Sequence, residues 1–219
     1  MNSQIKSELQ LRVASDLVCP WCFIGKRAID QALPILKERG VDVTIEWLPF
    51  QLNPGLPPEG MDRKTFRTAR FGSWEAALAM DDRAIKAGAG VGAQFRYDRQ
   101  KKTSNTLAGH ALVRLAGIEG GASLQERVVE ALFVAYFTNG KDVGDETILE
   151  QIATSSGMES GAVSRSRAMR DEVATTETAL RSASLNGVPS YIVDGRLLSS
   201  GAQDVGEYVR MLTAAARPI

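Results

Sequence analysis

The sequence predicts an α/β protein whose middle is helical. Three observations support this prediction: a strand–helix–strand pattern near the N-terminus, a strand–strand–helix pattern near the C-terminus, and helical periodicity over the roughly 125 residues between them. The chain has 219 residues, of which 44% are hydrophobic and 24% charged, as in globular proteins that bury a full core. Its formal net charge is zero, which gives no support for a nucleic-acid partner or an anionic membrane surface.

The N-terminal unit begins with a strand over Leu9–Ala14, where apolar and polar residues alternate. Apolar residues at helical spacing then predict a helix over Pro20–Arg39, which Gly40 ends in the expected way. Alternation returns over Val43–Leu48 and indicates a second strand. A strand–helix–strand unit of this kind predicts a right-handed crossover between two parallel strands.

The C-terminal unit begins with a strand over Ser190–Val193. Asp194–Gly195 is typical of a two-residue hairpin turn, and Arg196–Leu198 is the expected partner strand. We expect a loop over Ser199–Gln203, followed by an amphipathic helix that starts near Val205.

A linker rich in Pro and Gly, Gln51–Gly60, leads into the middle of the chain. Five helices are predicted beyond it: Trp74–Ala87, Thr106–Ala116, Leu124–Phe137, Glu146–Ser155 and Arg170–Ser184. This order of elements predicts a thioredoxin-like core with a large all-helical domain inserted in its middle. Residues 1–60 and 186–219 would form the core, and residues 61–185 the helical insertion domain.

The only two cysteines, Cys19 and Cys22, stand three residues apart where the first strand gives way to the first helix. Pro20 suits the first helical position, so Cys19 becomes the N-cap, with its sulfur near free backbone N–H groups and the positive end of the helix dipole. That environment favours the thiolate, which is the nucleophilic form. We therefore expect Cys19 to be the more exposed and more reactive thiol, and Trp21 to offer apolar surface to a peptide substrate.

Other kinds of active site have less support in the sequence. A zinc site needs about two ligands beyond the cysteine pair, and the chain offers no third cysteine and a single histidine, so we predict no metal. That histidine, His110, lies beside an apolar helical stripe, where packing is the commoner role. Its near-neutral titration leaves a direct role open. The sequence has no Gly-x-Ser-x-Gly element of a serine hydrolase.

The N-terminal segment Met1–Gln10 is polar and lacks the apolar core of a signal peptide. No segment approaches the apolar run that a membrane span requires. We therefore expect a cytoplasmic protein without membrane contact. Structural disulfides are unusual in that compartment, so a close cysteine pair there indicates catalysis or metal binding.

Four motifs occur in a familiar order: Asp16–Lys26 with its Cys-Pro-Trp-Cys, Ser104–His110, Gly187–Tyr191 and Ser200–Gln203. Together they resemble the FrnE-like branch of the DsbA family, which are thioredoxin-fold oxidoreductases with a helical insertion. The resemblance covers nearly the whole chain. It implies that Cys19 attacks and that Cys22 resolves the mixed disulfide.

The same resemblance implies a cis peptide bond between Val188 and Pro189, facing the cysteine pair. From the residues alone either isomer is open, because X–Pro bonds adopt cis at small cost. The alternative is that Pro189 simply starts an edge strand. The resemblance also places His110, together with Asn105, close to the active site.

The sequence therefore favours a thiol–disulfide oxidoreductase or isomerase acting on disulfide-containing or unfolded proteins, with Pro20, Trp21, Val188 and Pro189 contacting the substrate. An alternative is a glutathione-dependent transferase or isomerase, since kappa-class glutathione transferases and 2-hydroxychromene-2-carboxylate isomerases resemble this architecture. Those relatives typically carry Ser in place of Cys19, and the positions of Asn53 and the Ser200–Gly201 loop match where they hold glutathione. Glutathione thus stays open as a co-substrate, with no other cofactor expected. A third alternative is a non-enzymatic holdase.

Overall fold

The two ends of the chain build one sheet. In the computed structural model, which describes residues 7–216, strand β1 (Ser7–Ser15) pairs in parallel with β2 (Val41–Pro49). Helix α1 (Pro20–Glu38) makes the connection between them. The predicted parallel strand–helix–strand unit is confirmed.

The C-terminal hairpin completes the sheet, whose strand order is β2–β1–β5–β6. Strand β5 (Ser190–Val193) is antiparallel to both β1 and β6 (Arg196–Ser200). The turn residues Asp194 and Gly195 have φ values of 49° and 73°, as the tight hairpin predicted from them requires. Strand β6 continues to Ser200, two residues past the predicted end, because Ser199 and Ser200 still pair with β5.

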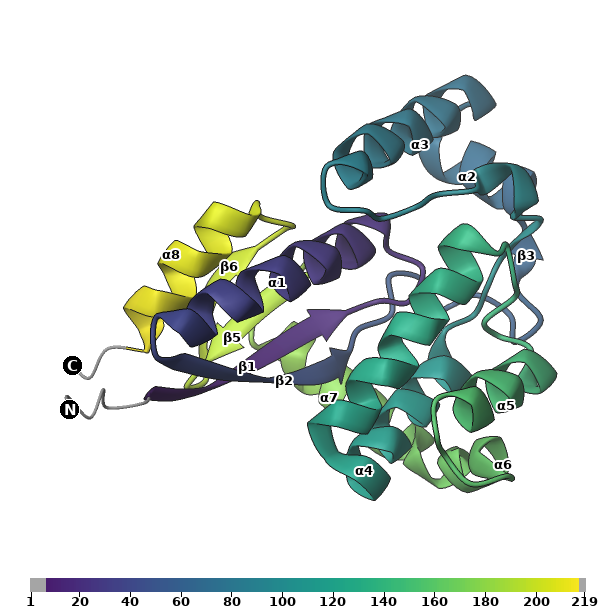
Figure 1. Cartoon of the computed structure of the whole chain (residues 1–219). Helices are drawn as coiled ribbons and strands as arrows, with labels where there is room; N and C mark the ends of the chain where they lie inside the picture. Colours follow the sequence, from purple (N-terminus) through teal and green to yellow (C-terminus); the bar gives the residue numbers. More distant parts are fainter. Residues whose placement is uncertain (1–6, 217–219) are drawn as a thin grey trace, which may run out of the picture.

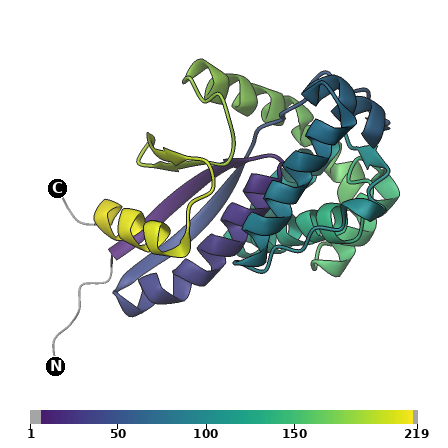
Figure 2. The ribbon, with the colours of Figure 1, turned by 90° about the horizontal axis from the view of Figure 1, so that it is seen from above.

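Helices cover both faces of this sheet (Figure 2). Helix α1 packs beside α8 (Val205–Ala215) on one face. Helix α7 (Arg170–Ser182) lies across the other face, where Leu48, Phe50 and Ile192 belong to a separate apolar cluster. The α/β class and the thioredoxin-like core expected from the sequence are both confirmed.

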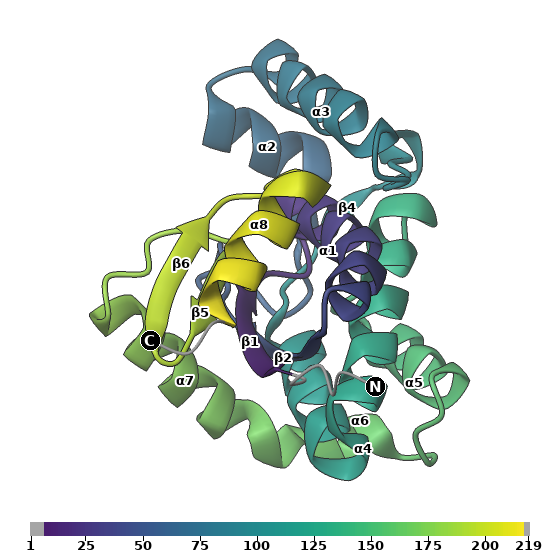
Figure 3. The same ribbon diagram turned by 60° about the vertical axis from the view of Figure 1, so that its left-hand side comes forward.

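The middle of the chain forms two groups of helices (Figure 3). One group is the pair α2 (Arg63–Phe71) and α3 (Trp74–Ala89). The other contains α4 (Leu107–Phe133), α5 (Glu146–Ser155) and α6 (Ala162–Ser166). Single irregular helical turns lie at Tyr97–Arg99, Val134–Thr138 and Arg167–Met169.

Some of these elements were not predicted. Helix α2 has few apolar residues at helical spacing, and its start is fixed locally, by Asp62 accepting a 2.8 Å bond from the Thr65 N–H. A two-residue ladder, β3 (Met61–Asp62) with β4 (Lys102–Thr103), joins segments forty residues apart, which local pattern does not reveal.

Helix α4 was expected as two helices, Thr106–Ala116 and Leu124–Phe137. The chain runs through both as one element, but Gly120 and Gly121 have non-helical backbone angles. The φ of Gly121 is 64°, in the left-handed region that favours glycine. The two predicted helices are therefore the two arms of a helix broken at this point.

An aromatic cluster joins the helical segment to the core. The Phe23 ring of α1 stacks on Phe133 at 5.4 Å between centroids and meets Phe95 edge-on at 5.7 Å. Phe137 stacks on the same Phe23 ring at 5.7 Å. One apolar cluster thus continues from the sheet into the insertion, and the division into residues 1–60 with 186–219 and residues 61–185 stays a prediction. Between residues 7 and 216, no helix is long and apolar enough to cross a membrane.

Candidate active site

The cysteine pair sits where the sequence placed it. Cys19 is the N-cap of α1, with φ −90° and ψ 113°, and Pro20 occupies the first helical turn. The Cys19 carbonyl accepts a 3.1 Å bond from the Cys22 N–H, which closes the first turn of the helix between the two cysteines. Both thiols are free.

Cys19 is only slightly more exposed than Cys22, and both side chains are buried. The relative exposure of Cys19 is 3%, against 1% for Cys22. The sulfur also makes no hydrogen bond to the helix N–H groups; the Cys19 thiol instead donates to the Val188 carbonyl at 3.6 Å. Tertiary packing accounts for both the burial of Cys19 and this bond, because the loop before β5 packs over the start of α1.

The two thiols nevertheless differ in access. Cys19 lines a cleft of about 290 Å³, whereas Cys22 does not border it. Burial raises the pKa of the Cys22 thiol well above its ordinary value, and the neighbouring Cys19 thiol adds to that rise. Cys22 is therefore held as a neutral thiol behind the accessible sulfur of Cys19.

The Val188–Pro189 peptide bond is cis, as the resemblance implied. The Pro189 carbonyl accepts a 2.8 Å bond from the Gly201 N–H, and the Ser200 and Ser190 hydroxyls lie 3.1 Å apart. Ser200 and Gly201 do not line the cleft. They hold the loop that contacts Cys19, and the structure does not place them where a ligand in the cleft would lie.

Residues at the start of α1 and on the α2–α3 pair line the cleft, and Figure 1 shows where these elements lie. Trp21 borders it with 37% of its surface exposed, in agreement with the sequence-based expectation. Asn53 borders it as well. The complete lining is Val18, Cys19, Pro20, Trp21, Leu52, Asn53, Phe66, Arg67, Arg70, Phe71, Met80, Asp81, Thr103, Tyr136, Gly187 and Val188.

Helix α2 supplies cleft residues that sequence analysis did not single out. Arg67 is paired, because its guanidinium contacts the Asp81 carboxylate at 2.6 Å, and the buried Arg63 shares the same carboxylate. Arg70 is exposed and forms no ion pair within the described part of the chain. Residues 63–71 contain four basic and two aromatic residues but no apolar stripe, so nothing in the sequence indicated that they would line the site.

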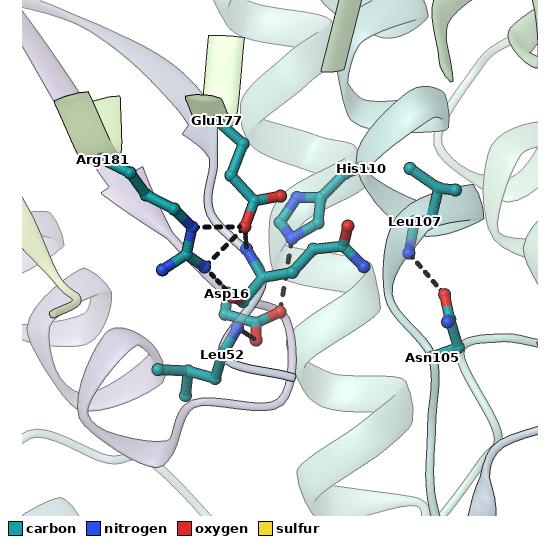
Figure 4. Close-up of polar contacts among 8 residues, drawn as sticks. Asp16, Leu52, Asn105, Leu107, His110, Glu177 and Arg181 are labelled. Carbon is teal, nitrogen blue, oxygen red and sulfur yellow. Dashed lines mark hydrogen bonds and ion pairs between the residues drawn. The ribbon is translucent and has the colours of Figure 1, made fainter. Parts of the chain in front are cut away.

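His110 does not face the cleft. It is 3% exposed, and its Nε2 atom lies 3.3 Å from the Asp16 carboxylate (Figure 4). The other Asp16 oxygen accepts a 2.7 Å bond from the Leu52 N–H, and the Asp16 carbonyl accepts a 3.1 Å bond from the Cys19 N–H. Asp16 thus connects the cysteine loop to α4, a role that sequence analysis missed.

Asn105 also lies away from the cleft lining. Its side-chain N–H donates to the Leu56 carbonyl at 2.7 Å. Its side-chain oxygen accepts from the Leu107 N–H at 3.0 Å, as Figure 4 shows. It therefore satisfies a backbone N–H in the first turn of α4 and fastens the 51–60 segment to that turn. The same segment is anchored from the other side by Arg181, which donates to the Gln51 carbonyl at 2.6 Å.

Lys26 fixes the orientation of α1 against α4. It is 3% exposed, and its ammonium lies 2.9 Å from Asp30, 2.6 Å from Glu126 and 3.0 Å from Glu130. Burial alone would lower the pKa of Lys26, but the three carboxylates outweigh it and raise the pKa above its ordinary value. No group of three or more His, Cys, Asp or Glu residues within the described ranges is arranged to hold a metal ion.

A thioredoxin-like sheet with a Cys-x-x-Cys pair at the start of its first helix and a cis-proline loop opposite defines the thioredoxin-fold class of proteins. Within that class, the chain belongs to the DSBA-like thioredoxin domain family, whose model matches residues 10–212.

The chain is similar to several known proteins. The chain is 26% identical over 205 residues to the uncharacterized protein YwbO of Bacillus subtilis (strain 168), a match that covers 91% of this chain and 94% of the relative. It is similar to the crystal structure of the probable DsbA oxidoreductase SCO1869 from Streptomyces coelicolor, with a TM-score of 0.83, 28% identity and coverage of 96% and 92%. The fold also resembles the cytosolic disulfide reductase DsbM from Pseudomonas aeruginosa with GSH, with a TM-score of 0.59, 17% identity and coverage of 95% and 96%.

Proposed function

We propose that this protein is a thiol–disulfide oxidoreductase or isomerase that uses Cys19 and Cys22 as its redox pair. The observation that carries the proposal is the unequal placement of two adjacent free thiols, one bordering a cleft and the other buried behind it. Family membership supports the same class of reaction. The FrnE-like branch is the part of that family we favour, on the motifs quoted above.

The arrangement suits a two-step exchange. Cys19 thiolate attacks one sulfur of the substrate disulfide, forms a mixed disulfide and releases the other substrate sulfur as a thiolate. Cys22 then loses its proton and attacks the Cys19 sulfur, which breaks the bond to the substrate and closes a Cys19–Cys22 disulfide. Two electrons pass from the dithiol to the substrate, and the reverse sequence oxidises a substrate dithiol.

Unfolded or disulfide-containing proteins are the proposed substrates. Trp21, Phe66 and Phe71 give the cleft apolar surface, and exposed apolar segments are what an unfolded chain presents. Pro20, Val188 and Pro189 lie next to the attacking sulfur, so we assign them contacts with the substrate chain near its disulfide.

We propose that the protein works in the cytoplasm, as a reductase or isomerase. The likeness to a cytosolic disulfide reductase supports this compartment. A reducing thiol pool would return the Cys19–Cys22 disulfide to the dithiol after each turnover.

Insulin reduction tests the proposed activity. With dithiothreitol as the electron source, the protein should accelerate precipitation of the insulin B chain, because the dithiol form attacks insulin disulfides faster than the small reductant does. The reduction potential of the pair, measured in glutathione buffers, should lie near the cytosolic range and well below that of a strong oxidant. A protein that binds unfolded insulin without reducing it would be a holdase, and the oxidoreductase proposal would then be wrong.

Glutathione is the second candidate ligand, as a co-substrate of the same site or, in the alternative function, of a transferase or isomerase. Arg70, which forms no ion pair with any residue between 7 and 216, and Asn53 both border the cleft that holds Cys19. An exposed cation that borders such a cleft attracts carboxylates, and glutathione carries two. The relative DsbM with bound GSH supports the same choice.

Arg70→Ala should slow the reaction of the dithiol protein with oxidised glutathione about two- to fivefold at low salt, since a solvated ion pair is worth up to about 1 kcal/mol. The effect should shrink as salt screens the charge. The rates are measured by following glutathionylation of Cys19 in a Cys22→Ser background. The matched control is Arg196→Ala, which removes an exposed arginine in the β5–β6 hairpin outside the cleft. Equal slowing with the uncharged bis(2-hydroxyethyl) disulfide would contradict carboxylate recognition by Arg70.

A further inference from the structure

Helix α1 comes close to strand β5 at Gly25, about one turn beyond Cys22. A Cβ atom placed on Gly25 would overlap the Tyr191 hydroxyl oxygen, and it would lie 3.1 Å from the Tyr208 hydroxyl oxygen and 3.5 Å from Cγ of Pro189. Glycine is the residue that lets another group approach a helix backbone this closely. The contact therefore depends on the absence of a side chain at position 25.

Tyr191 in β5 and Tyr208 in α8 form a rigid pair against this glycine. Both side chains are fully buried, and their rings meet edge-on with 5.1 Å between centroids. The Tyr208 hydroxyl donates a hydrogen bond to the Tyr191 hydroxyl and accepts one from the Gln203 N–H at 3.2 Å. Close packing and these hydrogen bonds leave the Tyr191 ring no room to turn away from α1.

Strand β5 begins directly after the loop that covers Cys19. The carbonyl of Val188, three residues before Tyr191, accepts the hydrogen bond of the Cys19 thiol at 3.6 Å. Pairing with β1 holds β5 within the plane of the sheet, whereas α1 and α8 pack side by side on one face (Figure 3). Ladder hydrogen bonds do not set the distance from a strand to a helix on the face of its sheet. The contact between Tyr191 and Gly25 sets that distance next to the loop.

We infer that Gly25 and Tyr191, with Tyr208 behind it, position the Val188–Pro189 loop over Cys19 so that the loop can hold a protein substrate. A protein chain extends beyond its disulfide and meets the loop, whereas a small disulfide needs only the Cys19 sulfur. Neither Gly25 nor Tyr191 lines the cleft, so both act through the loop as positioning residues. This inference rests on the proposed oxidoreductase function.

Gly25→Ala should raise the KM for insulin, obtained from initial rates of reduction at increasing insulin concentration. The added methyl group pushes Tyr191 and the loop away from α1. We expect a rise of about fivefold or more, because misplacement by about 1 Å can cost far more than that in an enzyme reaction. The rate with bis(2-hydroxyethyl) disulfide should not fall, since that molecule is too small to use the loop and the displaced Val188 carbonyl uncovers the Cys19 sulfur.

Rescue by a second substitution separates positioning from general damage. Tyr191→Phe removes the oxygen that the new methyl group would overlap, so Gly25→Ala with Tyr191→Phe should return the KM to within about twofold of wild type. Tyr208→Phe is the matched control, because it removes the hydroxyl 3.1 Å away and should rescue less. Gly206→Ala controls for the added methyl group. It alters an exposed glycine of α8, where the nearest side-chain atom is an Asp204 carboxylate oxygen at 3.3 Å, and it should leave both rates unchanged.

Three results would each overturn the inference: equal losses with insulin and the small disulfide, no change in KM for Gly25→Ala, or rescue by Tyr208→Phe as large as that by Tyr191→Phe. If Gly25→Ala fails to fold, Tyr191→Phe alone decides. It loosens the same contact and should raise the insulin KM about twofold or more without slowing the small disulfide, and an unchanged KM would contradict the positioning role. A wild-type protein that reduces neither disulfide would instead refute the proposed function itself.

Discussion

Cys22→Ser should trap substrate on the protein, whereas Cys19→Ser should form no adduct and lose all activity. Attack requires a sulfur that a substrate can reach, and only Cys19 borders the cleft. Without Cys22, the mixed disulfide has no intramolecular thiol to resolve it, so it persists. Without Cys19, the remaining thiol is buried and burial raises its pKa, which leaves little thiolate to react.

The measurement is non-reducing electrophoresis and intact mass after incubation with a disulfide-containing protein substrate. Cys22→Ser should gain the mass of one substrate thiol, and that mass should disappear with dithiothreitol. Insulin reduction by Cys19→Ser should equal the rate without protein. The double variant controls for noncovalent binding. An adduct on Cys19→Ser with none on Cys22→Ser would reverse the roles of the two cysteines.

Lys26→Met should destabilise the protein by about 3 kcal/mol at pH 7. Removing one partner of a buried ion pair costs about 3–5 kcal/mol. Its partners here keep 28–33% of their side-chain surface exposed, so water offsets part of the loss. Methionine has a similar length to lysine and preserves the packing between α1 and α4, so the variant isolates the charge.

Urea denaturation of the reduced proteins at pH 7 and pH 4 measures this effect. The difference from wild type should shrink at pH 4, because burial raises the pKa of Asp30, and protonation of Asp30 removes part of the repulsion that is left once the cation is gone. Lys37→Met is the control, since it removes an exposed lysine from the same helix and should cost less than about 1 kcal/mol. A loss of equal size at both pH values would indicate lost packing instead of unpaired charge.

Local features of the fold were readable from the sequence. The strand–helix–strand unit, the Asp194–Gly195 turn and the start of α1 at Pro20 each depend on residues a few positions apart. Such features follow from backbone geometry and the period of apolar residues, which operate within one element. The short ladder β3–β4 and the sparsely apolar helix α2 were missed for the converse reason, since packing against other segments defines them.

Some features of the candidate site likewise follow from local sequence, whereas others depend on tertiary packing. The sequence by itself determined the redox pair, its place as the N-cap and the partial exposure of Trp21, because all three follow from the order Cys-Pro-Trp-Cys at the start of a helix. Only the tertiary structure decided which distant groups meet that pair. Val188 reaches Cys19 across 169 residues, and His110 reaches Asp16 across 94.

These long-range approaches also explain why two of the candidate residues are buried. Cys19 is buried under the loop that carries Val188, and His110 is buried against Asp16. Arg70 lines the cleft only because α2 lies close to the start of α1 in the folded chain. The spacing of residues in the sequence determines which face of its own helix or strand a side chain occupies. The packing of helices and strands against one another determines which distant residues that face contacts.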